Sequence, residues 1–267
     1  MNGSKNLLEF EDNWRTAMGK WFPGERVVYR GKDLHHDLKD MSWLELFLFG
    51  ITGRQFTENQ MKVFTAIYTY TSFAEPRLWN NRVAALAGTA RSTPSLALGA
   101  ANAMSEASIY GHKPNTRSID FFLRTQKKLE QGADLDELIR DEMQKHRTIF
   151  GYGRPLNRID ERNPHFLQLL KETGLDQGKH IKLALEVERR LLEGRWRLRL
   201  NITGLDAAVA ADMGMSVREH HVFMTMCFLA GMPPCYIDAR DQREGCFFPI
   251  RCSRIKYEGV APRAWED

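Results

Sequence analysis

Apolar residues recur at intervals of three and four along most of the chain, which is the spacing of one face of an α-helix. Helix-start signals agree with this pattern, and the clearest is Ser216 followed by Glu219, the signature of a capping box. The only strand-like alternation lies near Phe247–Tyr257. The sequence therefore predicts a mainly α protein, with helices over Glu58–Tyr70, Ser95–Tyr110, Ser118–Gln131, Leu135–His146, His165–Glu172, Lys179–Leu192, Leu205–Met213 and Val217–Leu229.

Length and composition restrict the class of protein further. The chain has 267 residues, of which 43% are hydrophobic and 27% charged, as in soluble globular proteins of one or two domains. A net charge of +4 is too small to indicate a nucleic-acid partner. The most apolar run, Met41–Ile51, contains Glu45 and is shorter than the about 18 residues of a membrane helix. The N-terminus lacks a secretory pattern, and four cysteines without a CxxC pair fit free thiols, so we expect a cytoplasmic protein.

Two local compositions have more than one interpretation. Between Ala84 and Ser108 nearly all residues are small, which favours close helix packing either in the core or across a subunit interface. Arginines gather between Arg189 and Arg199, but Glu186, Glu188 and Glu193 interleave with them. We interpret this second segment as a solvated helix face.

The segment Gly151–Arg162 has the composition of an anion-binding turn. It reads GYGRPLNRIDER and places Arg154, Arg158 and Arg162 at intervals of four. Guanidinium groups arranged in this way suit phosphate or carboxylate ligands. Solvent-facing helix charges are the alternative interpretation of Arg158 and Arg162. A lone GxG without a preceding strand does not indicate a dinucleotide site.

The order of several short motifs resembles that of the citrate synthase superfamily, and within it the short citryl-CoA lyase branch. Gly151–Arg162 resembles the family's GFGHP…DPR segment, and Asn201–Ala208 resembles its Asn-Val-Asp-Gly helix start. Further landmarks are Thr52–Arg54, Arg82–Ala84 and Arg254–Gly259, so the resemblance spans roughly residues 42–259. It implies a citrate-synthase-like helical fold with a large helical domain, residues 1–112 and 200–267, and a small one, 113–199, over a CoA-ester cleft.

The chain departs from the family at the positions that carry catalysis. Tyr110 stands where the first catalytic histidine belongs, with His112 two residues later. Arg154 replaces the second histidine, and Thr203 replaces the catalytic aspartate. The family's additional substrate-binding histidine falls near Ser72–Glu75, which has none.

The resemblance preserves the ligand-binding arginines better. Arg162 matches the arginine of the DPR motif, and Arg254 matches a C-terminal arginine that in the family reaches the neighbouring subunit's active site. We expect both to bind the carboxylate of a small molecule. Gly151, Gly153 and Arg158 are the expected contacts of coenzyme A, and no covalent cofactor is expected.

The family's reaction needs a base and two hydrogen-bond donors. Thr203 cannot be the base, because its hydroxyl is a poor proton acceptor near neutral pH, and losing a positioned base costs about two to four orders of magnitude in rate. Tyr110 can donate to an enolate, and Arg154 can stabilise an oxyanion. Asp206 or His112 is the candidate replacement base. Asp206 near a helix start can equally be an acidic residue that complements the helix dipole.

We expect no metal site. His220 and His221 are adjacent and point to different helix faces, and His35 and His36 lie in a polar loop, so neither pair chelates an ion easily. Surface or interface histidines with satisfied hydrogen bonds are the expected interpretation.

Three functional hypotheses follow. The first is an enzyme that forms or cleaves a carbon–carbon bond of an acyl-CoA with an atypical catalytic set. The second is a catalytically silent subunit that pairs with an active paralogue and supports it. The third is a CoA-ester-binding regulatory protein. Each implies a homodimer or a heterodimer with a homologous subunit, and none requires a nucleic acid or a membrane.

Overall fold

Helices dominate the computed structural model, which describes residues 3–108, 110–154, 159–247, 250–261 and 263. The predicted mainly α class is confirmed. The described residues form two compact units: unit 1 comprises Met1–Tyr70 and Ser108–Met226, and unit 2 comprises Thr71–Ala107 and Cys227–Asp267. The predicted domains, 1–112 with 200–267 and 113–199, divide the chain at other positions and remain a prediction.

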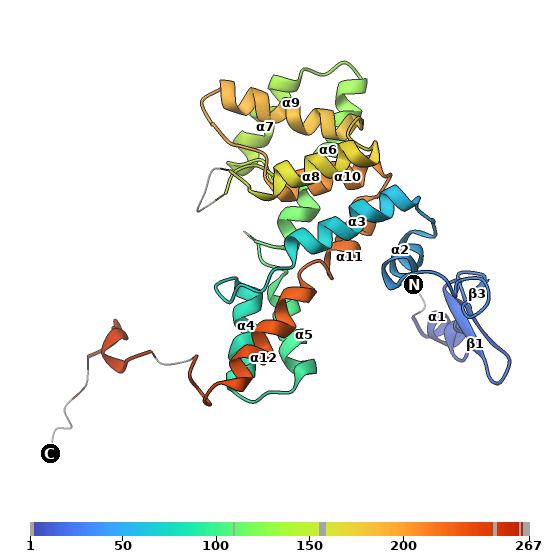
Figure 1. Ribbon diagram of the computed structural model, residues 1–267, viewed down its shortest axis with the longest axis horizontal. Helices are drawn as coiled ribbons and strands as arrows, with labels where there is room; N and C mark the ends of the chain where they lie inside the picture. Colours follow the sequence, from blue (N-terminus) through green and yellow to red (C-terminus); the bar gives the residue numbers. More distant parts are fainter. Residues whose placement is uncertain (1–2, 109, 155–158, 248–249, 262, 264–267) are drawn as a thin grey trace. The chain divides into compact units, whose positions relative to one another are not determined.

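Unit 1 contains the short strands and most of the helices (Figure 1). Its elements are α1 (Gly3–Phe10), β1 (Gly19–Phe22), β2 (Arg26–Tyr29), β3 (Lys32–Asp33), α2 (Trp43–Thr52), α3 (Glu58–Thr71, whose last residue belongs to unit 2), α6 (His112–Glu130), α7 (Leu135–His146), α8 (Arg162–Thr173), α9 (Lys179–Glu193), α10 (Ile202–Asp212) and α11 (Val217–Met224). Unit 2 contains α4 (Trp79–Thr89), α5 (Pro94–Met104), η1 (Leu229–Gly231), α12 (Met232–Asp241) and η2 (Cys252–Arg254).

Several helix boundaries follow from local chemistry. α7 has its predicted bounds, and Asp134 caps it by accepting a hydrogen bond from the N–H of Glu137. α6 begins six residues earlier than expected. Gly111 adopts a φ of 90° immediately before it, and Pro114 falls in the first turn, where helix N–H groups have no intrahelical partner. The predicted helix Ser95–Tyr110 ends at Met104, and the predicted helix Val217–Leu229 ends at Met224.

The predicted strand near Phe247–Tyr257 is wrong. The described residues of that stretch are almost all exposed and contain η2, with no strand beside them to pair with. The sheet lies instead at the start of the chain, where β1 pairs with β2 and β2 with β3, both antiparallel. Strands of two to four residues are too short to show an alternating pattern.

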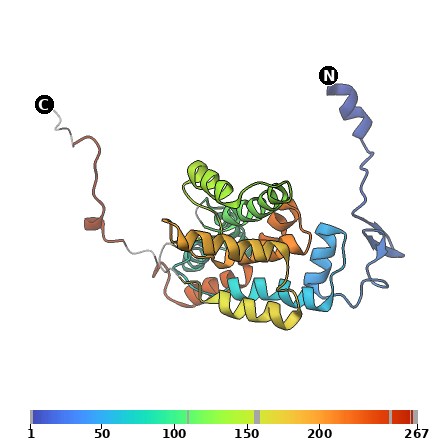
Figure 2. The ribbon, with the colours of Figure 1, turned by 90° about the horizontal axis from the view of Figure 1, so that it is seen from above.

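α10 lies at the centre of unit 1. Every residue from Gly204 to Ala211 is buried, and the helix packs against α6 and α9. α3 and α8 run side by side, as Figures 1 and 2 show. The Nδ2 of Asn59 donates to the carbonyl of Thr173 at 3.1 Å, and the rings of Tyr70 and Phe166 lie 6.0 Å apart. These two contacts join α3 and α8 near both ends of the pair.

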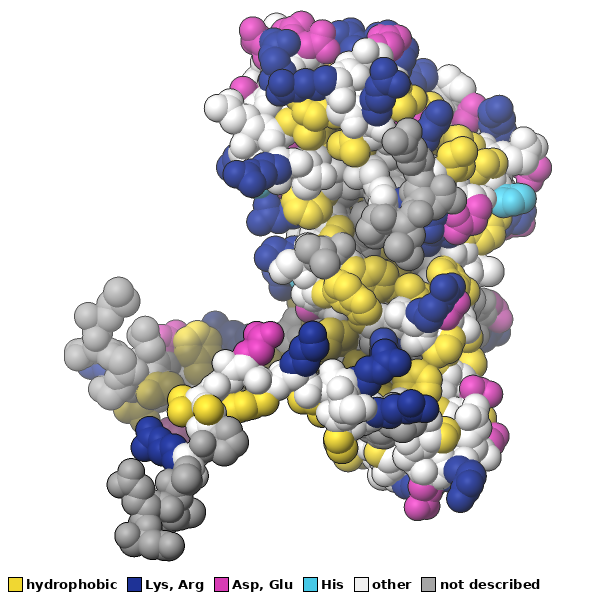
Figure 3. All heavy atoms as spheres, turned by 90° about the vertical axis from the view of Figure 1, so that its left-hand side faces the viewer, with side chains coloured by type: hydrophobic (Ala, Val, Ile, Leu, Met, Phe, Trp, Pro, Cys, Tyr) yellow, Lys and Arg dark blue, Asp and Glu magenta, His cyan; other side chains and the backbone are white. Residues whose placement is uncertain are grey.

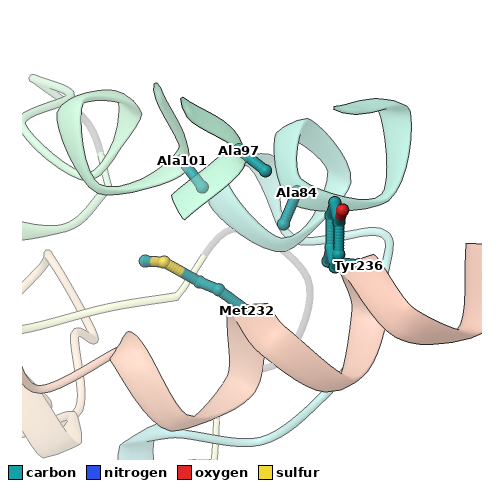
Figure 4. Close-up of a cluster of buried hydrophobic side chains, with 5 residues drawn as sticks. All are labelled: Ala84, Ala97, Ala101, Met232 and Tyr236. Atoms are coloured by element: carbon teal, nitrogen blue, oxygen red, sulfur yellow. The ribbon is translucent and has the colours of Figure 1, made fainter. Parts of the chain in front are cut away.

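Small residues allow close packing in unit 2. Ala84, Ala97 and Ala101 meet Met232 and Tyr236 in a buried cluster formed by α4, α5 and α12 (Figure 4). A Cβ on Gly88 would lie 2.3 Å from the carbonyl oxygen of Tyr236. The core interpretation of the small-residue segment is thus correct. The interface interpretation stays a prediction, and the outer side of α5 carries Leu96 and Met104 in exposed positions.

Surface charge and hydropathy add little to this picture. On the face shown in Figure 3, Lys and Arg side chains lie among Asp and Glu side chains, in keeping with the small net charge. Among the described residues, one stretch, Val217–Asp241, is long and apolar enough to cross a membrane by composition alone. It consists of α11, a turn, η1 and α12, and 44% of its most apolar window is buried. Core helices pass the same test, so this is weak evidence of a span.

Candidate functional site

The glycine turn Gly151–Arg154 is joined to the chain that leads into α10. Tyr152 and Leu200 form an antiparallel bridge. The N–H of Asn201 donates to the carbonyl of Gly151 at 2.9 Å, and the N–H of Gly153 donates to that of Arg199 at 2.7 Å. Asn201 also caps α10, because its side-chain oxygen accepts from the N–H of Gly204. Two motifs far apart in the sequence therefore form one rigid element.

Glycine is required on both sides of the contact between the glycine turn and α10. Gly151 has a φ of 96°, and a Cβ there would lie 2.7 Å from the Cα of Gly204. Gly204 is equally confined, because its own Cβ would lie 2.5 Å from the carbonyl oxygen of Gly151. The structure thus gives Gly151 a packing role in addition to the predicted one in binding coenzyme A.

Asp160 and Arg162 form an ion pair beneath the start of α10. The Nε and Nη2 of Arg162 each donate to one carboxylate oxygen of Asp160, both at 2.8 Å. Asp160 also accepts from the N–H of Ile202 at 2.9 Å, although its side chain is fully buried. Burial raises the pKa of Asp160, but the hydrogen bonds and charge of Arg162 and the Ile202 N–H outweigh it and lower the pKa overall. Arg162 is therefore not the solvent-facing helix charge of the alternative interpretation.

Arg154 lines a pocket of about 230 Å³ next to the glycine turn. The other lining residues are Gly153, Trp196, Arg197, Leu198 and Arg199. Arg154 donates through Nη1 to the carbonyl of Ile159 at 2.9 Å and to Glu161 at 2.5 Å. Three arginines line the pocket, and the guanidinium group of Arg154 already has a carboxylate partner.

The interpretation of Arg189–Arg199 as one helix face is half right. Arg189 and Arg190 do lie on α9 and both pair with Glu186. α9 ends at Glu193, so Arg197 and Arg199 lie beyond it, in the extended chain that pairs with the glycine turn. Charge interleaving alone does not show where a helix stops, and the signal that separates the two groups is Gly194.

Asp206 is a buried acid, not a residue of the exposed first turn. It is the fifth residue of α10 and only 1% exposed. Neither carboxylate oxygen accepts a hydrogen bond from any described residue. Burial raises the pKa of Asp206 well above its usual value, Arg162 opposes this, and Asp160 adds to it. The helix-dipole interpretation is therefore wrong, and the buried carboxyl retains its proton well above its usual pKa.

Histidines from α6 and α11 meet near the position of the missing catalytic histidine. His112 is the first residue of α6 and 1% exposed, and its ring lies 6.5 Å from that of His221. His220 is fully buried, and neither ring nitrogen has a described hydrogen-bond partner. Burial, followed by His221 and His112, lowers the pKa of His220 to about 3. The expectation of a satisfied surface or interface histidine is wrong for His220.

The remaining predicted residues have simpler positions. Tyr110 and Thr203 are half-buried, just before α6 and at the second residue of α10. Arg158 lies outside the described residues. Arg254 is exposed in η2 of unit 2, and its predicted place in a neighbouring subunit's site stays a prediction. Within the described ranges, no three His, Cys, Asp or Glu side chains are grouped so as to hold a metal ion.

Sequence comparison with models of protein families gives no match, and neither does comparison with curated proteins. Structure comparison does give matches. The fold is similar to that of citryl-CoA lyase from Hydrogenobacter thermophilus, with a TM-score of 0.82 and 18% identity over 95% of this chain and 98% of that chain.

Two further solved structures share the fold. ATP citrate lyase from Methanothrix soehngenii, in complex with citrate and coenzyme A, matches with a TM-score of 0.75 and 17% identity over 98% of this chain and 45% of that chain. Citrate synthase from Thermoplasma acidophilum, in a ternary complex with carboxymethyl coenzyme A and oxaloacetate, matches with a TM-score of 0.65 and 16% identity over 85% of this chain and 59% of that chain. The expected resemblance to the citrate synthase superfamily is thereby confirmed for the fold.

Proposed function

We propose that this protein binds an acyl-CoA thioester and a small carboxylate in the cytoplasm, and that it forms or cleaves a carbon–carbon bond between them with an atypical catalytic set. One observation carries the proposal. The glycine turn, the start of α10 and the Asp160–Arg162 pair converge beside a pocket with three arginines. Similar folds were solved with coenzyme A or its analogue and with citrate or oxaloacetate.

The arginine pocket suits the phosphates of coenzyme A. Arg154, Arg197 and Arg199 supply positive charge, and each charge-assisted hydrogen bond to a phosphate contributes about 1.5–3 kcal/mol. Trp196 also lines the pocket, and Arg195 lies over its indole ring, 5.0 Å from the ring centroid. A planar base would stack on the other face of the ring, a contact that contributes about 1–3 kcal/mol per base in nucleic-acid complexes.

Arg162 is suited to hold the carboxylate of the second substrate. A guanidinium has five N–H donors, and Asp160 takes two of those of Arg162. The others remain for a ligand, while the bidentate pair holds the guanidinium in one orientation. Asp160 is thus a positioning residue that also anchors α10 through Ile202.

The proposed reaction needs hydrogen-bond donors and a base. Tyr110 donates a hydrogen bond to the enolate oxygen of the acyl-CoA. Arg154, the other donor expected from the sequence, is assigned to the phosphates instead, because it lines the arginine pocket. His112 or Asp206 takes the place of the family's aspartate. Asp206 is buried and its pKa is raised, so it must first lose its own proton inside the protein before it can act as a base. His112 has the side chain that most often serves as a base in enzymes.

A silent supporting subunit is the second candidate. Thr203 stands where the family has its catalytic base. Arg254 is present and exposed, and the resemblance assigns this residue to the active site of a neighbouring subunit. The apolar outer side of α5, with Leu96 and Met104, would supply a dimer surface. Native mass spectrometry of the protein from its own source distinguishes the candidates, because a homodimer supports the enzyme and a heterodimer supports the silent subunit.

Calorimetry with coenzyme A tests the proposal. The wild type is expected to bind, and Arg197→Gln is expected to weaken binding about tenfold, the effect of one charged contact. Arg189→Gln, on the surface of α9, is the matched control and should bind like the wild type. No heat of binding with the wild-type protein, alone or in its native complex, would refute the ligand. Binding without turnover of any acyl-CoA would favour a regulatory protein.

A further inference from the structure

Glu161 stands at the start of α8, but its carboxylate pairs with Arg154 and not with that helix. It occupies the N-cap of α8, where a short side chain such as Asp or Ser accepts hydrogen bonds from the first helix N–H groups and where a negative charge is favoured by the helix dipole. Its carboxylate caps nothing there. It contacts Arg154 instead, with Oε2 2.5 Å from Nη1 and Oε1 3.4 Å from Nη2.

This contact involves an arginine of the pocket but lies outside the pocket itself. Arg154 lines the pocket with Arg197 and Arg199, whereas Glu161 is not among the lining residues. The Glu161 side chain is 66% exposed, so it can leave Arg154 without exposing a buried surface. Asp160 lies farther from Arg154, at 3.9 Å, and is committed to Arg162 and Ile202. Glu161 is therefore the carboxylate that occupies Arg154 and can still be exchanged for another anion.

We propose that Glu161 is a built-in competitor for Arg154 and thereby determines which anions the pocket accepts. The inference rests on the proposed function only in taking the pocket as the site of the phosphates of coenzyme A. Glu161 occupies the Nη1–Nη2 edge of Arg154, so a ligand that binds this edge must displace Glu161, and weakly charged anions that have only this contact are rejected. A polyanion that also contacts Arg197 and Arg199 compensates for the displacement through the additional contacts.

The test compares Glu161→Gln with the wild type by calorimetry, using inorganic pyrophosphate and coenzyme A as probes. Glutamine keeps the size of the side chain and removes its charge. The expected result is binding of both probes about threefold to tenfold tighter in Glu161→Gln, the range for releasing one partly exposed charge-assisted contact. In an Arg154→Gln background the same Glu161→Gln change should have no effect on affinity.

A matched control separates this local competition from a change in net charge. Glu193 also pairs with an arginine, at 2.6 Å from Arg189, and its side chain is 61% exposed. Glu193→Gln makes the same charge change on α9 and should leave both affinities unchanged. Circular dichroism of each variant would confirm that the helices are retained.

Each result has a distinct meaning. Equal affinities of the wild type and Glu161→Gln for both probes would overturn the competitor role while leaving coenzyme A binding, and so the proposed function, intact. An equal gain in Glu193→Gln would overturn it in the same way, because net charge would then explain the effect. Absence of pyrophosphate and coenzyme A binding in every protein, Glu161→Gln included, would overturn both proposals.

Discussion

Gly151 and Gly204 are 53 positions apart in the chain and pack with no room for a single methyl group between them, since a Cβ on Gly151 would lie 2.7 Å from the Cα of Gly204. This contact fixes the glycine turn against the first turn of α10. Because the arginine pocket and the Asp160–Arg162 pair are attached to these two segments, the contact also fixes the candidate site.

Gly204→Ala is expected to destabilise the protein by about 2 kcal/mol, because the methyl group meets backbone atoms that cannot move aside independently. Gly99→Ala is the matched control. Gly99 also lies inside a helix, α5, but a Cβ there meets nothing within 4 Å, so alanine should stabilise by about 0.5–1 kcal/mol. Urea unfolding measures both changes. Equal effects of the two substitutions would contradict the close contact.

Asp206→Asn is expected to change how stability depends on pH. The folded protein raises the pKa of Asp206 above the unfolded value of about 3.8, so between these values the folded state holds a proton that the unfolded chain has released. The contribution of Asp206 to stability is therefore fully present below the unfolded pKa and is lost as the pH rises towards the folded pKa.

Urea unfolding of the wild type and Asp206→Asn at pH 4 and pH 8 measures this effect. The variant, which cannot ionise, should gain stability relative to the wild type between the two pH values. About 1.4 kcal/mol is expected for each unit by which the pKa is raised. A difference between the two proteins that is the same at both pH values would show that Asp206 titrates normally and is accessible to water.

His220 should make the protein sensitive to acid. Its pKa is lowered from 6.5 to about 3, so in this range the unfolded chain binds a proton that the folded protein excludes. Stability should fall by about 1.4 kcal/mol per pH unit below 6.5 from this residue alone. His220→Phe should remove that part of the slope in unfolding experiments between pH 6.5 and 4.5. His165→Gln, at an exposed position on α8, is the control. A wild-type slope that persists in His220→Phe would assign the acid sensitivity to other groups.

The isolated chain is expected to show no citrate synthase turnover in the ordinary enzyme range, about 1 per second or faster. Tyr110, Arg154 and Thr203 stand at the three positions of the family's catalytic set, and residues that act as a unit lose function together. Release of free thiol from acetyl-CoA in the presence of oxaloacetate is the measurement. Turnover in that range would show that the substituted residues still perform the family's reaction.

The sequence was informative where structure is local and uninformative where it depends on distant contacts. The bounds of α7 follow from Asp134 and the apolar spacing after it, which lie within a few residues of each other. The hydrogen bond from Ile202 to Asp160 joins segments 42 residues apart, so nothing in the local pattern distinguishes Asp160 from a surface acid.

The same limit applies to His220 and to the pocket. His220 follows Arg218 and Glu219 and looks like an exposed helix residue, and only the packing of α11 shows that water is excluded from it. Asp206 is different, because the small apolar residues around it were a local sign of burial that the helix-dipole interpretation did not use. Arg197 and Arg199 looked like members of a charged helix face, although Gly194 marks the point after which they belong to the pocket. By contrast, the order of the family-like motifs was sufficient to predict the fold.

A structure of the protein with a bound CoA thioester tests the central claim most directly. The account predicts that the phosphates lie within hydrogen-bond distance of Arg154 and Arg197, that the base contacts Trp196, and that Glu161 has moved away from Arg154. A CoA thioester bound elsewhere on the chain, with the Arg154–Glu161 contact intact and the arginine pocket unchanged, would contradict it.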